Sequence, residues 1–285
     1  MKSSDHAPEA AEVQPPLGSS DEQAAAGRIF EFAEDWERPA AVPVSSEAWE
    51  LFPEVQNILR VAWESVDGAV TVARLTHRVL RQKDGRDSRG AYAAVAQNSL
   101  RAALNFAGAG LDAGLKRLVE DALPRLIAFD NRTAEKLGSF AEKRITATNG
   151  GVSATSLVEL LIHRGSNPRD ILLDKWSSDL RANSAQSVER VDEIAMALGV
   201  DSPEIRKRAN PSAKSLLLRD AFRERNKIAH ELDVSKPRGK SRQAMERIQT
   251  GRRADDISKW AWEMLNVAQL VVNDVAVRIK KNEQP

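Results

Sequence analysis

Apolar residues recur through most of this chain at the spacing of one face of an α-helix. Residues 91–123 show the pattern most clearly, with leucine or alanine at positions 100, 104, 107, 111, 115 and 118. Such positions lie on one side of a helix with 3.6 residues per turn, whereas strand residues alternate. Similar patterns run from residue 46 to the end, and no segment is a convincing strand. The sequence therefore predicts an all-α protein.

Capping residues and glycines refine this prediction. Ser46 is expected to cap a helix that begins the patterned region, and Pro124 is expected to start a further helix. Asn167 with Pro168, and Ser184 or Ser187, are the predicted starts of two later helices, and the closing helix is predicted from Asp255 to about residue 281. The helix over residues 91–123 contains three glycines, which indicate close approach by a neighbouring helix: Gly108, Gly110 and Gly114.

Composition limits the remaining possibilities. The chain has 285 residues, 42% of them hydrophobic and 29% charged, enough for one substantial core. Residues 1–45 are rich in alanine, proline and acid, and are predicted to be a flexible acidic tail. There is no cysteine, and no apolar run approaches the roughly 20 residues that span a bilayer, so a cytoplasmic protein without a membrane segment is expected. A net charge of +1 means that nucleic-acid binding would depend on local clusters of charge.

Residues 216–232, LLLRDAFRERNKIAHEL, are the most informative segment for function. Drawn as a helix, they have one apolar face with Arg225 in its middle; its other members are Leu217, Leu218, Ala221, Phe222, Ile228, Ala229 and Leu232. An unpaired buried charge is very costly. Arg225 is therefore expected to meet a carboxylate, a second subunit or an anionic ligand.

A polar stripe flanks that face. Arg219, Arg223, Asn226 and His230 follow one another at i, i+4, i+7 and i+11. A histidine can move protons near neutral pH, and an arginine can stabilise charge on phosphate oxygens, so the set suits RNA cleavage by attack of the 2′-hydroxyl without metal or cofactor. Because efficient transfer benefits from both an acid and a base, a symmetric homodimer with two copies of His230 in one cleft is expected.

The residues RNKIAH, 225–230, in the context FRERNKIAHELD, resemble the R-N-x-x-x-H signature of HEPN domains, and the surroundings are similar to the RiboL-PSP-HEPN branch. Supporting segments are GLDAGLKRL at residues 110–118, RANSAQSVERVDEIAMALGVD at residues 181–201, and the closing helix. The likeness covers roughly residues 90–280, and the motif is its specific part. Relatives often have an aromatic residue where this chain has Gly114.

The resemblance implies a HEPN-like helical bundle that dimerises and acts as a metal-independent endoribonuclease, often a toxin or antiviral-defence effector. Arg225 would bind and stabilise the phosphate, Asn226 would orient the site, and His230 would be the acid or base. Asp112 is the candidate partner of Arg225. The expected division is an acidic tail (1–45), an N-terminal helical extension (46–85) and the HEPN-like domain (86–285).

RNA contacts are predicted for basic residues on and after the motif helix: Arg219, Arg223, Lys227, Lys236, Arg238 and Lys240. The alternatives are solvated surface charges for the first three and a solvated loop for the linker over residues 234–253. His230 could instead be a favourable cation at the helix end, and Arg225 part of an ion pair within one subunit. His6, His77 and His163 have no metal-ligand spacing, so no metal site is predicted.

Two other functions are consistent with the same residues. One is a catalytically inactive HEPN-type module that binds RNA, a nucleotide or a partner protein. The other is a helical antitoxin or adaptor, whose acidic tail would bind a basic partner. A regulatory or antitoxin protein is also a candidate partner for the enzyme.

Overall fold

The computed structural model describes residues 38–83, 91–146, 167–213, 215–231 and 251–283. All regular secondary structure in these ranges is α-helical, and no strand occurs in them, so the all-α prediction is confirmed. The helices are α2 (Ser46–Leu51), α3 (Pro53–Lys83), α4 (Ala91–Leu126), α5 (Asn131–Thr146), α7 (Pro168–Ala182), α8 (Val188–Ala197), α9 (Pro203–Ala209), α10 (Leu217–Glu231) and α12 (Ala254–Glu283). No helix in the described ranges is long and apolar enough to cross a membrane.

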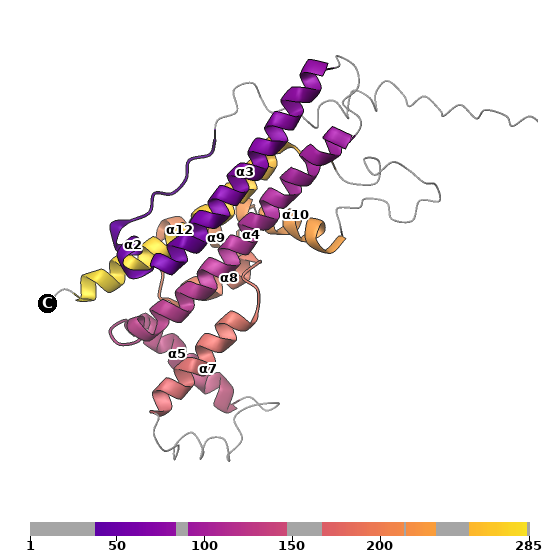
Figure 1. Cartoon of the computed structure of the whole chain (residues 1–285). Helices are drawn as coiled ribbons and strands as arrows, with labels where there is room; N and C mark the ends of the chain where they lie inside the picture. The colour runs from indigo at the N-terminus through magenta and orange to yellow at the C-terminus, as the bar shows by residue number, and fades with distance from the viewer. Residues whose placement is uncertain (1–37, 84–90, 147–166, 214, 232–250, 284–285) are drawn as a thin grey trace, which may run out of the picture.

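Three long helices form the centre of the molecule. Figure 1 shows α3 and α4 side by side and α12 packed against them, while α5 and α7 lie at one end. The predicted apolar face of α4 is the core: Leu104, Leu111, Leu115 and Leu118 are fully buried. The periodicity thus identified both the longest helix and its buried side.

Two α4 glycines allow α3 to approach closely, as predicted. A Cβ atom at Gly110 would collide with the Cβ of Ala62, and one at Gly114 would lie 2.9 Å from the Cδ2 of Leu59. Real Cβ contacts are almost never that short. The side chain of Leu59 therefore fills the space beside Gly114.

Two predicted helix starts are corrected. Ser45, not Ser46, caps α2, because its hydroxyl accepts a hydrogen bond from the Ala48 amide at 3.1 Å. Pro124 does not start a helix, since α4 continues through it to Leu126. The proline removes only the donor for the carbonyl of Glu120, an exposed residue that water can reach, so the helix tolerates it.

The later caps follow the predictions more closely. Asn167 caps α7 ahead of Pro168, and Ser187 caps α8 by accepting from the Arg190 amide. Gly199 ends that region with φ +68°, a left-handed conformation that glycine adopts at little cost. Helix α9 was not anticipated; its seven residues, with Pro203 in the first turn, are too short for a clear periodic pattern.

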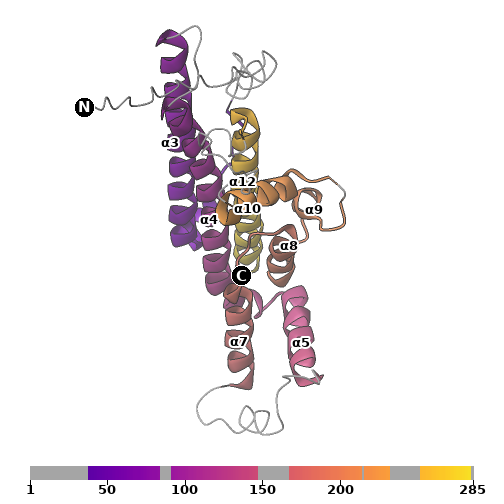
Figure 2. The same ribbon diagram turned by 90° about the vertical axis from the view of Figure 1, so that its right-hand side faces the viewer.

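Helices α8, α9 and α10 gather on one side of α12, as Figure 2 shows. Residues 38–45, the end of the predicted tail, form an extended segment on α12. Asn266 accepts from the Val42 amide (2.7 Å) and donates to the Ala40 carbonyl (3.1 Å). Asn273 accepts from the Ser45 amide (3.2 Å) and donates to the Pro43 carbonyl (2.8 Å). Residues 1–37, the predicted loop at 146–151 beyond Thr146 and the predicted helix at 156–163 lie outside the described residues.

Candidate functional site

Helix α10 carries the motif and contacts both α12 and α4. Its buried apolar residues are Leu218, Ala221, Phe222 and Ile228, four members of the predicted apolar face. Two other members, Leu217 and Ala229, are exposed; Leu217 is the first residue of α10 and Ala229 lies in its last turn. The helix crosses its neighbours, as Figure 2 shows, and a crossing helix contacts them mainly over its middle, so residues near its ends can stay exposed. Leu232 lies outside the described residues.

Arg225 is half-buried and packs on the backbone of α4. A Cβ atom at Gly108 would lie 3.4 Å from Nε of Arg225 and 3.6 Å from its Cγ, which are ordinary van der Waals distances, so the arginine side chain lies directly against α4 at this glycine. Nε is buried and has no hydrogen-bond partner. Burial lowers the pKa of Arg225 below its ordinary value, an effect that the charge of Asp112 partly offsets.

The guanidinium of Arg225 has no ion pair with a carboxylate in the described part of the chain. Its Nη1 donates to Oδ1 of Asn226 at 3.2 Å. Asp112 exerts an electrostatic effect, but its oxygens accept from Lys116 at 3.0 Å and from the Ala185 amide at 2.6 Å. Asp112 is therefore a nearby charge and not a direct partner, and no carboxylate of the described residues neutralises Arg225 at close range.

His230 lies one helical turn after Asn226, in the last turn of α10. Residues four apart share one side of a helix, so Asn226 connects Arg225 to His230 along the surface of α10. The imidazole is exposed, and no hydrogen bond or ion pair fixes it among the described residues. These three residues form a continuous polar strip; we call Arg225, Asn226 and His230 the motif strip.

The other basic residues of α10 already have partners. Arg219 donates to the carbonyls of Ala213 and Pro211, both at 2.5 Å, and thereby holds the segment that leads into α10. Arg223 pairs with Asp220 at 2.9 Å and with Glu224 at 3.0 Å. Lys227 pairs with Glu224 at 3.1 Å. Arg223 and Lys227 remain exposed enough to meet an anion, although each already has an ion-pair partner.

Glu224 was overlooked in the sequence, yet it is the charge centre of this region. It is buried and pairs with Arg252, which is also buried, as well as with Arg223 and Lys227. Burial alone would raise the pKa of Glu224, but hydrogen bonds from Arg223, Arg252 and Lys227 outweigh burial and lower it to about 2. The signal in the sequence is an acid inside a cluster of arginines, RERNK.

Arg252 belongs to the end of the predicted basic linker. Its amide donates to Oε1 of Gln97 at 2.8 Å, and its carbonyl accepts from Nε2 of the same side chain at 2.9 Å. Gln97 on α4 and Glu224 on α10 thus fix the chain just before α12 begins. The linker residues Lys236, Arg238 and Lys240 lie outside the described residues.

A stripe on α4 faces Arg225; of its polar members, Asp112 was singled out from the sequence, whereas Arg101 and Asn105 were missed. Arg101, Asn105, Gly108 and Asp112 follow at i, i+4, i+7 and i+11, so they share the side of α4 that meets Arg225. Oδ1 of Asn105 is buried without a hydrogen-bond partner, like Nε of Arg225. A donor and an acceptor left unsatisfied on facing helices indicate that this contact is not optimised for stability alone.

The described residues contain no group of three or more histidine, aspartate or glutamate side chains placed to hold a metal ion. The structure thus defines an all-α protein with a polar strip on a crossing helix. Comparison with protein-family models, with curated proteins and with solved structures gives no match.

Proposed function

We propose that this protein is a metal-independent endoribonuclease of the HEPN type, built as a homodimer around the motif strip, and that it acts as a toxin or an antiviral-defence effector in the cytoplasm. The bundle would then be HEPN-like, with an added N-terminal helix and a disordered acidic tail. The observation that carries the proposal is Arg225, a half-buried cation without an ion pair among the described residues. A phosphate group of RNA would supply the missing negative charge.

The motif strip has the groups that the reaction needs. The 2′-oxygen of a ribose attacks the adjacent phosphorus, the bond to the 5′-oxygen breaks, and a 2′,3′-cyclic phosphate and a 5′-hydroxyl result. A base removes the proton from the 2′-hydroxyl, and an acid protonates the departing 5′-oxygen. His230 would carry out these proton transfers. Arg225 would stabilise the charge on the other phosphate oxygens, and Asn226 would hold the guanidinium.

A dimer would explain two further features. The first is the exposed His230, which lacks an orienting partner within the described residues of one subunit. The second is an apolar flank on α4, where Val95 is 46% and Phe106 is 44% exposed. These two residues are 11 apart and therefore on the same side, and Ala109 and Ala113 extend it. A second copy on this flank would lie beside α10.

The test is incubation of the full-length protein with RNA in the presence of a chelator. Wild type is expected to cleave and to leave cyclic phosphate ends. We expect His230→Ala to lower the rate by about 10²–10⁴ and Arg225→Ala by about 10²–10³, with the dimer retained in gel filtration. Arg132→Ala, which removes an exposed ion pair with Asp201, is the matched control and should leave the rate unchanged.

A substrate with 2′-deoxyribose at the cleavage position should resist cutting, because it lacks the nucleophile. Absence of cleavage by wild-type protein, or full activity of His230→Ala, would contradict the proposal.

The freedom of the His230 side chain favours a second candidate, a catalytically inactive module that binds RNA or a nucleotide through Arg225. This candidate predicts RNA binding that is lost in Arg225→Ala and retained in His230→Ala, with no cyclic phosphate formed. An antitoxin or adaptor would instead lose its partner on deletion of residues 1–37, which spares the segment over residues 38–45 that is bonded to α12.

A further inference from the structure

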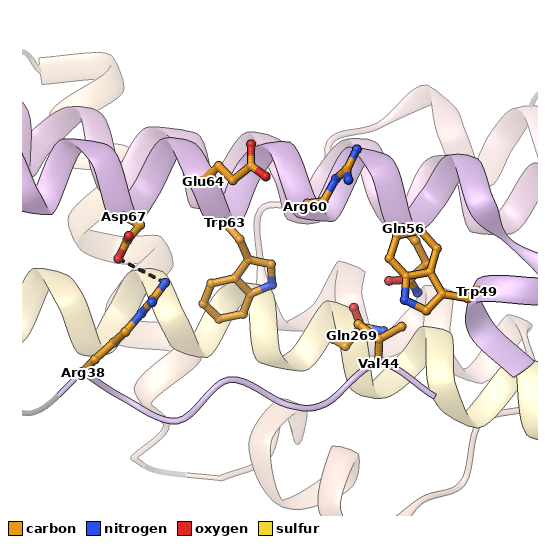
Figure 3. Close-up of a pocket in the computed structure, with 9 residues that line it drawn as sticks. All are labelled: Arg38, Val44, Trp49, Gln56, Arg60, Trp63, Glu64, Asp67 and Gln269. Carbon is orange, nitrogen blue, oxygen red and sulfur yellow. Dashed lines mark ion pairs between the residues drawn. The ribbon is translucent and has the colours of Figure 1, made fainter. Parts of the chain in front are cut away.

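A pocket of about 220 Å³ lies between α3, α12 and the extended segment over residues 38–45, as Figure 3 shows. It does not include any residue of the motif strip. Its lining residues are Arg38, Val44, Trp49, Gln56, Arg60, Trp63, Glu64, Asp67 and Gln269.

The walls of this pocket are held in place. Asn266 and Asn273 bind the backbone of the extended segment through the four hydrogen bonds described above. Trp63 makes an edge-to-face contact with Trp262, with ring centroids 5.7 Å apart and an interplanar angle of 70°. A wall fixed in this way needs little ordering when a ligand binds.

Gln56 is the unusual member of the lining. Its side chain is 2% exposed, and its Nε2 is buried without a hydrogen-bond partner. A buried donor left unsatisfied is destabilising, and native proteins retain few of them. A ligand that places an acceptor at Nε2 would remove this penalty.

The charges around the pocket cancel. Arg38 pairs with Asp67 at 3.0 Å and also lies over the Trp262 ring, 5.5 Å from its centroid. Arg60 and Glu64 are one turn apart on α3 and have opposite charge. Two cations against two anions give no preference for a phosphate or an ammonium group, so the pocket suits a neutral ligand.

The indoles indicate the shape of that ligand. Trp49 is 43% exposed, which is unusual for so large an apolar side chain, and Trp63 is only partly buried. In Figure 3, Trp63 and Gln56 project from α3 toward the extended segment, and Trp49 stands at one end of the pocket. Aromatic rings of a ligand pack well against indole faces and edges.

We propose that this pocket binds a small, neutral, planar heteroaromatic molecule that presents a carbonyl or ring-nitrogen acceptor to Gln56, which is the chemistry of a nucleobase. The base could belong to a free nucleoside or to a single-stranded RNA. The proposal is independent of the activity proposed for the motif strip, because the two sites share no residue.

The test compares two probes of nearly the same shape, benzimidazole and indole, at neutral pH. Both have a ring N–H, but only benzimidazole has a ring-nitrogen acceptor. By calorimetry, wild-type protein is expected to bind benzimidazole about tenfold more tightly than indole, the effect of one hydrogen bond. Gln56→Leu should abolish this preference, Trp49→Ala should weaken the binding of both probes, and Thr71→Leu, at an exposed position of α3 outside the lining, should change neither.

Nucleosides and a single-stranded oligouridine then distinguish the two sources. If Gln56→Leu weakens the binding of uridine but not of the oligonucleotide, the ligand is a free nucleoside. If it weakens the binding of both, bases of RNA enter the pocket. Failure of wild type to bind benzimidazole or any nucleoside would overturn the proposal, as would equal binding of benzimidazole and indole.

Thermal unfolding gives a second criterion without any ligand. Because Nε2 of Gln56 has no hydrogen-bond partner among the described residues, Gln56→Leu should leave Tm unchanged or raise it. A Tm lowered by several degrees, or a variant that does not fold, would mean that Gln56 is a structural residue and would also overturn the proposal.

Discussion

Glu224 and Arg252 form an ion pair in which each side chain is only 7% exposed. The two residues are 28 positions apart in the chain, and the pair joins α10 to the segment that begins α12. Gln97 of α4 binds both the amide and the carbonyl of Arg252. This arrangement fixes three helices relative to one another next to Arg225.

Removal of the Glu224 charge should destabilise the protein strongly. In Glu224→Gln, the buried Arg252 loses the carboxylate of Glu224, so we expect the free energy of unfolding to fall by about 3–5 kcal/mol. Denaturant unfolding followed by circular dichroism measures this free energy of unfolding. Asp220→Asn, which removes only the exposed partner of Arg223, should cost less than about 1 kcal/mol. Equal losses in the two variants would contradict this prediction.

The same carboxylate should make stability depend on acidity. The pKa of Glu224 is lowered from 4.5 to about 2, so folding favours its ionised form. This contribution is fully present above pH 4.5 and is lost as the pH falls toward 2. The free energy of unfolding of wild type should therefore fall more steeply between pH 4.5 and 2 than that of Glu224→Gln. Parallel pH profiles would show that Glu224 is not the group responsible.

Two glycine substitutions should have opposite effects. Gly110→Ala places a methyl group against Ala62 where α3 and α4 touch, and overpacking of this kind typically costs about 1–3 kcal/mol. Gly68→Ala on α3 meets no atom within 4 Å and should stabilise the helix by about 0.5–1 kcal/mol. Thermal unfolding of both variants checks this, and a stabilised Gly110→Ala would mean that the two helices are further apart.

Arg225→Met tests whether Arg225 is kept for stability or for function. Methionine retains an apolar stem beside Gly108 and removes a guanidinium whose Nε has no partner. We expect the free energy of unfolding to stay the same or to rise by about 1 kcal/mol, together with loss of RNA cleavage or binding. A drop of several kcal/mol would instead assign Arg225 a structural role.

Local patterns accounted for much of the fold. The spacing of leucines identified α4 and its buried side. Asn167 was recognised as a cap and Ser187 was one of two candidates, because capping is a short-range interaction between a side chain and the next amides. Two predicted helix starts were wrong. The sequence allows either Ser45 or Ser46 to cap α2, and it allows Pro124 to lie inside a helix because water can reach the carbonyl that loses its donor. Helix α9 was too short to show a period.

The motif strip was also recognisable, since RNKIAH lies in one helix and its relative positions follow from 3.6 residues per turn. The surroundings of the motif strip could not be recognised from the sequence. Asp112 was expected to pair with Arg225 but accepts from Lys116 and Ala185, and Leu217 and Ala229 were expected to be buried but are exposed. The domain boundaries at residues 45 and 85 remain predictions.

The sequence by itself determined that the chain is helical, which side of each long helix is apolar, and that a cation interrupts the apolar side of α10, because each of these depends on residues within a few turns of one another. Only the tertiary structure decided that the cation lies against Gly108, that Glu224 meets Arg252, and that Gln56 lines a pocket with its Nε2 lacking a hydrogen-bond partner among the described residues. These relationships involve residues far apart in the sequence, and their positions are set by the packing of the whole core.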